Sequence, residues 1–163
     1  DVITENGGTP LRTQVGHSFI KDTMRDSGAV FGGEHSAHYY FRDFWGADNG
    51  MLAALHVLSE LGHADRPLSE LVSEYSRYAE SGEINSVVSD QGAVQEAVLA
   101  QFGNRGEVDR LDGLTIRGTT HNQFWWFNVR ASNTEPLLRL NVEAETTSLM
   151  EQIRDEVLGT IRT

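Results

Sequence analysis

The chain has 163 residues, enough for one ordinary domain or two small ones, and it contains no cysteine, which excludes disulfides, thiolate catalysis and sulfur-ligated zinc. Its 13 Lys and Arg against 24 Asp and Glu give a formal charge of −11, and the field of so acidic a protein repels nucleic acid and anionic membranes. No stretch approaches the roughly 20 apolar residues that span a bilayer, so we expect a soluble cytoplasmic protein with no nucleic-acid and no membrane partner.

The first part of the chain alternates turns with short apolar segments. Residues 2–3 look like the end of a strand that enters the glycine turn at residues 7–8, and this abrupt start suggests a piece of a longer protein. Apolar positions predict a short helix over residues 17–24, and the run at residues 29–31 is typical of a buried strand. Because Gly32-Gly33 follows, the next residues are predicted to lie in a loop, where functional side chains are frequent.

Two helices are predicted further on. Either Asp48 or Asn49 can cap the first, whose apolar positions continue to residue 61 and which ends at Gly62. The second follows Pro67, a residue suited to a helix start.

The second half of the chain has a different pattern. Helical periodicity fades over residues 79–83, so we place a domain boundary between residues 80 and 81. Asp90 is predicted to cap one helix, and a capping box at residues 148–151, Ser-Leu-Met-Glu, to begin the closing helix. Strands are predicted at residues 84–88, 107–110, 114–117, 124–130 and 137–144, the last with the alternation of a half-buried antiparallel strand.

These elements predict a fold class of α/β plus α+β. Residues 1–80 form an incomplete mixed α/β domain in this interpretation. Residues 81–163 form a small α+β domain whose antiparallel sheet is covered by helices on one face.

The hexapeptide GEHSAH, residues 33–38, offers several kinds of chemistry. A metal site would use His35 and His38 with Glu34, but the glycines just upstream indicate a loop rather than a helix that would align such ligands. A nucleophilic Ser36 would need an oriented base and an oxyanion hole, and nothing around it resembles a nucleophile elbow. A loop that binds hydroxyl groups is the more natural interpretation, since carboxylates accept hydrogen bonds while Ser and His donate or accept them.

The heptapeptide RASNTEP, residues 130–136, connects two strongly patterned strands. Its guanidinium, hydroxyl, amide and backbone N–H groups match the many acceptor oxygens of a phosphate, and Arg139 could reach the same anion from the next strand. A tight hairpin, with its polar side chains satisfying the turn and its arginines solvated, explains the same residues equally well.

Aromatic residues have two explanations as well. Phe124-Trp125-Trp126-Phe127 could form a stacking platform, but such a strand more often packs in a core. Tyr39 and Tyr40 could line a ligand site or belong to the core.

Three segments together resemble a known family. GGTPLRTQVGHSFIK, FGGEHSAHYYFRDFWGADNGM and RASNTEPLLRLNVEA are similar, in this order, to the C-terminal part of bacterial phosphomannomutases of the α-D-phosphohexomutase superfamily. The resemblance covers essentially the whole chain. It implies most of a third, sugar-binding domain followed by a fourth, phosphate-binding domain with a TATA-box-binding-protein-like antiparallel sheet.

The resemblance also implies roles for individual residues. Glu34 and Ser36 would bind two adjacent sugar oxygens. His38 would lie near the transferred phosphoryl group, and His17 would face the same cleft, so both are candidates for acid or base chemistry. The phosphate that is not transferred would be held by Arg130, Ser132, Asn133 and Thr134, with Arg139 in support.

What the chain lacks relative to the family is equally informative. The family transfers its phosphoryl group from a phosphoserine in a TASHNP-type loop and holds Mg²⁺ in a DGDGDR-type loop, and neither motif occurs in this sequence. The resemblance therefore implies a parent enzyme, a phosphohexomutase, whose missing N-terminal domains bind Mg²⁺, while no metal or cofactor is expected in this chain and the chain alone is predicted to be inactive. The expected substrate is mannose 6-phosphate or 1-phosphate. The alternatives are phosphoglucomutase, phosphoglucosamine mutase, or a non-catalytic module that binds a phosphosugar.

Overall fold

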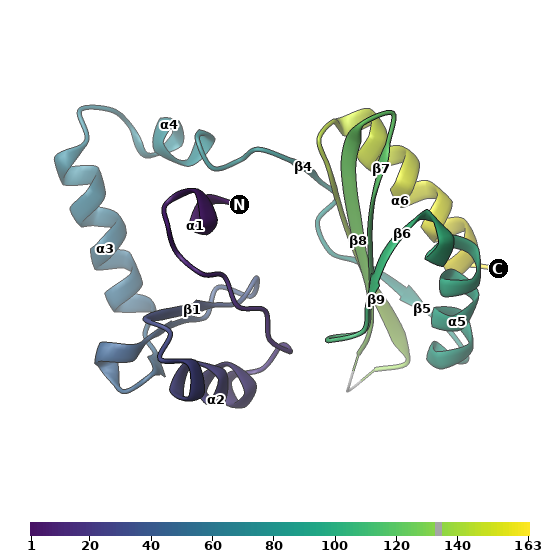
Figure 1. The fold of residues 1–163 in the computed structure, drawn as a ribbon, viewed down its shortest axis with the longest axis horizontal. Helices are drawn as coiled ribbons and strands as arrows, with labels where there is room; N and C mark the ends of the chain where they lie inside the picture. Colours follow the sequence, from purple (N-terminus) through teal and green to yellow (C-terminus); the bar gives the residue numbers. More distant parts are fainter. Residues whose placement is uncertain (133–134) are drawn as a thin grey trace. The chain divides into compact units, whose positions relative to one another are not determined.

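A computed structural model describes residues 1–132 and 135–163. The chain separates into two compact units, Asp1–Tyr75 and Ser76–Thr163. Both combine helices with antiparallel sheets, which confirms the predicted mixed α/β class (Figure 1). The domain ranges 1–80 and 81–163 stay a prediction.

The first unit is built around a three-stranded antiparallel sheet in the order β1-β2-β3. Its elements are α1 (Val2–Glu5), α2 (His17–Ser27), β1 (Phe31–Gly33), β2 (Tyr39–Phe41), the 3-10 turn η1 (Arg42–Phe44), β3 (Ala47–Asp48), α3 (Gly50–His63) and α4 (Leu68–Ser73).

Helix α2 covers one face of this sheet. Ile20 and Met24 lie one turn apart, so both face the same side, where they are buried with Tyr40 of β2. Gly32 of β1 permits this close packing, because a Cβ there would lie 2.9 Å from Ile20 Cγ2 and 3.0 Å from Met24 Sδ.

The local predictions for this unit are partly confirmed. The helix predicted after Asp48 or Asn49 is α3, and Asn49 is its cap, since Oδ1 of Asn49 accepts a hydrogen bond from the Leu52 N–H at 2.9 Å. Residues 2–3 do not end a strand but lie in the short helix α1. The segment predicted as a buried strand over residues 29–31 is exposed at Val30 and Phe31, because strand β1 begins only at Phe31 and α2 covers the opposite face.

The second unit is a six-stranded antiparallel sheet with two helices. Its elements are β4 (Ala79–Glu80), β5 (Ile84–Val87), α5 (Gln91–Phe102), the 3-10 turn η2 (Gly103–Arg105), β6 (Gly106–Asp109), β7 (Leu114–Thr120), β8 (Gln123–Ala131), β9 (Leu137–Ala144) and α6 (Thr147–Ile161). The strand order is β4-β9-β8-β7-β6, and β5 also pairs with β9.

Helices α5 and α6 lie on one face of this sheet (Figure 1). The core between them and the strands includes fully buried Trp125 and Phe127, whereas Phe124 and Trp126, which alternate to the other face, are only partly buried. In β9 Leu138, Leu140 and Val142 are buried, as the alternation predicted. The opposite face of the sheet carries Arg130 and Arg139 together with the partly buried Phe124 and Trp126.

The closing helix begins differently from the prediction. Its cap is Thr146, whose Oγ1 accepts from the Leu149 N–H at 3.3 Å, while Ser148 lies inside the helix and is exposed. Asp90 does cap α5 as predicted, accepting from the Ala93 N–H at 2.9 Å. Among the described residues, no helix is long and apolar enough to cross a bilayer.

Candidate functional site

The GEHSAH motif forms the turn of the β1–β2 hairpin. The Glu34 N–H donates to the His38 carbonyl at 2.9 Å and the Ala37 N–H donates to the Glu34 carbonyl at 3.0 Å, with Ala37 in the left-handed region at φ +64°. Glu34 and His38 therefore lie where the loop leaves and rejoins the sheet, and exposed His35 and Ser36 form its tip. Over residues 1–132 and 135–163, no three His, Asp or Glu side chains are placed to share a metal ion.

His38 is held by the next strand of the sheet. Its Nδ1 lies 2.6 Å from Oδ2 of Asp48 in β3. This hydrogen bond raises the pKa of His38 above its ordinary value, with a smaller contribution from the charge of Glu34, and it lowers the pKa of Asp48. The pair therefore favours a protonated imidazole beside an ionised carboxylate.

Glu34 is held from inside the unit. The hydroxyl of fully buried Tyr40 donates to Oε1 of Glu34 at 2.5 Å. Burial, followed by this carboxylate, raises the pKa of the Tyr40 phenol, so the phenol keeps its proton and remains a donor. One carboxylate oxygen is thus engaged, and the other is left to accept hydrogen bonds from a ligand.

His17 belongs to the same neighbourhood. It begins α2 and lines a cleft of about 450 Å³ together with Lys21, Tyr40 and Asp48. The charge of His17 also contributes to the lowered pKa of Asp48. The structure thus brings His17 and His38 to one carboxylate, and Lys21, the single lysine of the sequence, lies beside them.

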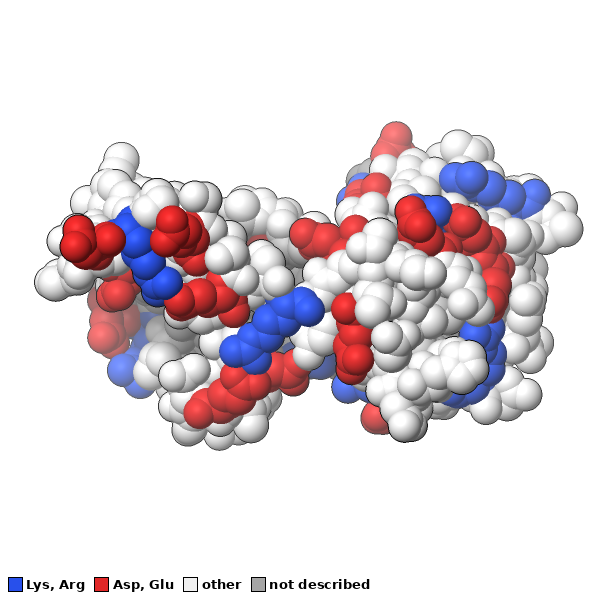
Figure 2. Space-filling view, turned by 90° about the horizontal axis from the view of Figure 1, so that it is seen from above, with Lys and Arg blue, Asp and Glu red and all other residues white. Residues whose placement is uncertain are grey.

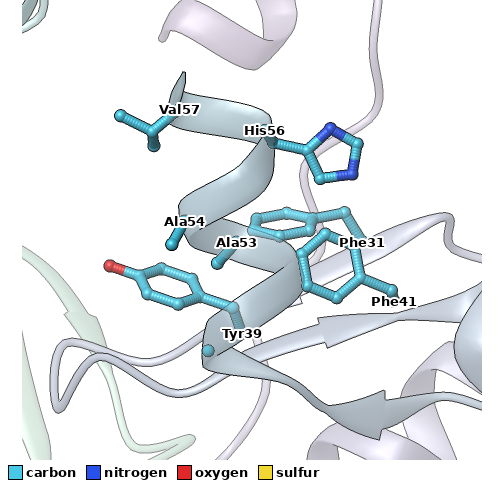
Figure 3. A pocket seen from close by; sticks show the side chains of 8 residues that line it. Phe31, Tyr39, Phe41, Ala53, Ala54, His56 and Val57 are labelled. Carbon is cyan, nitrogen blue, oxygen red and sulfur yellow. The ribbon is translucent and has the colours of Figure 1, made fainter. Parts of the chain in front are cut away.

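A second hollow of about 720 Å³ has a different character (Figure 3). Phe31, Tyr39 and Phe41 of the sheet line it with Ala53, Ala54 and Val57 of α3, and the rings of Phe41 and His56 stack at 5.4 Å. A lining so apolar suits packing against apolar side chains rather than binding of a sugar hydroxyl.

In the second unit the predicted arginines face each other across two strands. Arg130 of β8 and Arg139 of β9 are register partners, so their side chains leave the same face of the sheet, the one without helices. Arg130 Nη1 lies 3.7 Å from Asp112 Oδ2, and Arg139 Nη1 lies 3.3 Å from Glu83 Oε1. Nε of Arg139 is buried and has no hydrogen-bond partner among the described residues.

The loop between these strands is anchored by α5. Nε2 of Gln91 donates to the carbonyl oxygens of Leu137, Glu135 and Ser132, at 2.9, 3.1 and 3.4 Å. The Ser132 N–H also donates to the Leu137 carbonyl at 2.9 Å. The two ends of the loop are therefore fixed. Asn133 and Thr134, two of the predicted phosphate ligands, lie outside the described residues.

Two residues of these sites were missed by sequence reasoning. Asp48 was considered only as a helix cap, although its place ten residues after His38, next to the real cap Asn49, leaves its carboxylate free for another partner. Gln91 follows the cap of α5 and carries no sequence signal for a contact more than 40 residues away.

Charged side chains are spread over the face drawn in Figure 2 rather than concentrated in one patch. Lys and Arg side chains lie among the carboxylates on this face. The arginine pair of β8 and β9 can therefore act on a small anion through local hydrogen bonds, even in a protein with a formal charge of −11.

Comparison with protein-family models gives two ordered matches. Residues 1–78 match phosphoglucomutase/phosphomannomutase alpha/beta/alpha domain III, and residues 83–160 match the C-terminal domain of the same family. The chain therefore belongs to the phosphoglucomutase/phosphomannomutase family.

Individual relatives agree with this assignment. The chain is 43% identical over 160 residues to a phosphomannomutase from Salmonella montevideo, with 96% of this chain and 34% of the relative covered. It is 38% identical over 161 residues to a phosphomannomutase from Methanocaldococcus jannaschii, with 99% and 35% covered. The chain thus spans about a third of the length of these relatives.

A solved structure shows the same fold. The crystal structure of a phosphoglucomutase/phosphomannomutase family protein from Burkholderia thailandensis superimposes with a TM-score of 0.81 at 28% identity. The match covers 98% of this chain and 34% of that one.

Proposed function

We propose that this chain is the substrate-recognising C-terminal part of a phosphomannomutase that interconverts mannose 6-phosphate and mannose 1-phosphate through a bisphosphorylated sugar. The relatives from Salmonella montevideo and Methanocaldococcus jannaschii, both named phosphomannomutase, support mannose as the sugar. In this proposal the chain holds the phosphosugar, and the chemistry of phosphoryl transfer belongs to the parts of the enzyme that are outside it.

The observation that carries the proposal is the register pair Arg130 and Arg139. Two guanidinium groups on one face of the sheet, at the mouth of an anchored loop, offer up to ten N–H donors in total, about five each. Among the described residues, each group contacts one carboxylate by a single Nη atom, so donors remain for a phosphate. The buried Nε of Arg139, without a partner among the described residues, is a donor that a phosphate oxygen would satisfy.

The β1–β2 hairpin supplies the other half of the proposed recognition. Glu34, with one oxygen fixed by Tyr40, accepts from a sugar hydroxyl, and Ser36 at the exposed tip binds an adjacent one. His38 lies near the transferred phosphoryl group, with His17 lining the neighbouring cleft. Fixing both the phosphate and the hydroxyl groups of the sugar is catalysis by positioning.

Mg²⁺ is expected to act in the complete enzyme and to be held by a segment outside this sequence. The described residues show no group of three ligands for it, so no step is assigned to a metal here. The sequence also carries no TASHNP-type phosphoserine loop. We therefore expect the 163-residue chain alone to give no turnover of mannose 1-phosphate.

The proposal is tested by isothermal titration of the chain with mannose 6-phosphate. We expect weak binding that is lost in Arg130→Ala, because the phosphate then loses a charge-assisted bidentate partner. Arg154→Ala is the matched control: it removes the same charge from α6, on the helix-covered side, where Arg154 Nε bonds Asp155 at 2.8 Å. Equal heats from the wild type and Arg130→Ala would contradict the phosphate clamp.

Two further ligands separate the parts of the proposal. Inorganic phosphate should bind more weakly than mannose 6-phosphate if the hairpin contacts the sugar. Tighter binding of glucose 6-phosphate than of mannose 6-phosphate would favour the phosphoglucomutase branch instead.

A further inference from the structure

Asp48 contacts two consecutive residues, His38 at the end of the hairpin loop and Tyr39 at the start of β2. Its Oδ2 lies 2.6 Å from Nδ1 of His38, and its Oδ1 accepts from the Tyr39 N–H at 2.9 Å. We propose that Asp48 is a positioning residue: it holds the His38 imidazole by Nδ1 and so leaves Nε2 as the atom that meets the substrate. The inference rests on the proposed function, in which His38 lies near the transferred phosphoryl group.

The carboxylate can orient the ring because its own place is fixed by the backbone. Asp48 pairs in register with Tyr40 across β2 and β3, and the Asn49 N–H donates to the Tyr39 carbonyl at 2.9 Å. Asn49 in turn begins α3 as its cap. The direction of Oδ2 is therefore set by the sheet, and His38, half-exposed in the hairpin, takes its orientation from it.

The orientation determines which ring nitrogen is available. In the neutral ring Nδ1 carries the hydrogen donated to Asp48, so Nε2 has a free lone pair that can accept a hydrogen bond from a hydroxyl. In the protonated ring Nε2–H can donate to a phosphoryl oxygen. No described residue is hydrogen-bonded to Nε2, and the ring side chain is 50% exposed, so the atom is open to a ligand.

Two carboxylates act on this ring directly, and the cleft beside Asp48 also contains charged or titratable groups of α2, namely His17, Lys21, Asp22 and Arg25. Asp48 on β3 and Glu34 in the hairpin both favour its protonation, while His17 on α2 acts on Asp48. Because the Asp48 hydrogen bond is the largest of these influences, its removal should lower the pKa of His38 towards the ordinary value of 6.5.

The test is nuclear magnetic resonance of the uniformly ¹⁵N-labelled 163-residue chain. Long-range ¹H–¹⁵N spectra report which nitrogen of each imidazole carries the proton, and a pH titration gives the midpoint of each of the six histidines. We expect neutral His38 to be the Nδ1–H tautomer. In Asp48→Asn we expect its midpoint to fall and this tautomer to be lost or mixed, while His35 in the same loop stays unchanged.

Asp43→Asn is the control for charge alone. Asp43 lies in the same unit, is exposed, and bonds Arg42 Nε at 3.1 Å rather than a histidine. We expect it to leave both the midpoint and the tautomer of His38 as in the wild type. An equal shift in the two variants, or no change in Asp48→Asn, overturns the positioning role.

The wild-type spectrum keeps the proposal testable even if Asp48→Asn fails to fold. A neutral His38 that carries its proton on Nε2 overturns the proposal without any variant. Addition of mannose 6-phosphate then distinguishes a failure of the proposed function from a failure of the positioning role of Asp48. If the tautomer is Nδ1–H but the sugar phosphate perturbs neither His38 nor Arg130, the proposed function fails while the positioning of the ring by Asp48 stands.

Discussion

Single side chains decide how the hairpin presents its polar groups. Tyr40 is fully buried next to Ile20 and Met24, yet its hydroxyl reaches Oε1 of Glu34 at 2.5 Å. The ring belongs to the core, and the hydroxyl orients a carboxylate of the candidate site. The core explanation for this tyrosine is therefore confirmed, while a place in a ligand site stays a prediction.

The first residue-scale prediction concerns this contact. Tyr40→Phe should lower the free energy of unfolding of the first unit by about 1.5–3 kcal/mol, the usual contribution of a hydrogen bond to a charged group. The loss is measured by amide hydrogen exchange of residues 17–63. The same variant should also weaken mannose 6-phosphate binding, because Glu34 is then no longer held in one orientation.

Tyr39→Phe is the matched control. Tyr39 is the neighbouring residue of β2, is partly exposed, and its hydroxyl has no hydrogen-bond partner among the described residues. We expect the amide exchange rates of the Tyr39→Phe variant to match those of the wild type. If Tyr39→Phe and Tyr40→Phe destabilise equally, the hydroxyl of Tyr40 has no special role.

At the scale of elements, the closing helix α6 shows how a local pattern can indicate a helix but misplace its start. Three residues with hydroxyl side chains, Thr146, Thr147 and Ser148, directly precede Leu149. The cap is Thr146, whose backbone is extended at φ −132° and ψ 150°. Ser148 is the first residue of the capping-box pattern Ser-Leu-Met-Glu, but it lies inside the helix, which begins at Thr147. The apolar stripe of Leu149, Ile153, Val157 and Ile161 is buried as predicted, because a period of 3.6 depends only on local geometry.

The element-scale prediction follows from this cap. Thr146→Ala should destabilise the second unit by about 1 kcal/mol, since the Leu149 N–H loses its acceptor. Urea unfolding followed by the fluorescence of buried Trp125 measures the change. Ser148→Ala, at the position that the sequence favoured, should change stability by less than about 0.5 kcal/mol, as expected for an exposed site without such a contact. If Ser148→Ala destabilised the second unit more than Thr146→Ala, Ser148 rather than Thr146 would be the cap of α6.

At the scale of the whole molecule, the two units differ in how much they bury. Among the described residues, sixteen hydrophobic side chains form the buried core of the second unit, while the buried core of the first unit consists of Ile20, Met24 and Tyr40. Helix α3 has no buried residue, and its Met51 and Leu58 are 72% and 60% exposed. Burial of apolar surface is the main favourable contribution to stability, at roughly 25 cal/mol per Å². The second unit should therefore be the more stable of the two.

This difference gives a prediction for the intact chain. Amide protons of β7, β8, β9 and α6 should exchange far more slowly than those of α2 and α3, because opening of the first unit requires little loss of buried surface. Native-state hydrogen exchange at increasing denaturant measures both units in one sample. Similar opening free energies for the two sets of amides would contradict the prediction and would show that the units unfold together.

The local secondary structure and the family of this protein could largely be predicted from the sequence alone. The sequence pattern located β5 to β9 of the second unit, though not the short β4, and the stripe of α6. Residue types at the helix starts indicated the cap Asp90 and limited the other cap to Asp48 or Asn49, because caps and patterns depend on neighbouring residues. Ordered motifs indicated the family that the comparisons then showed. The roles of the candidate site residues were implied by that resemblance and stay proposals.

Only the tertiary structure decided which side chains meet. Contacts such as His38 with Asp48, Glu34 with Tyr40, and Gln91 with the loop after β8 join different elements, and they depend on strand register and helix packing. It also showed that the apolar residues of α3 are exposed in this chain, although their pattern is that of a buried face. A sequence pattern reports which face of an element is apolar, whereas burial requires another surface to cover it, and that surface is set by the fold.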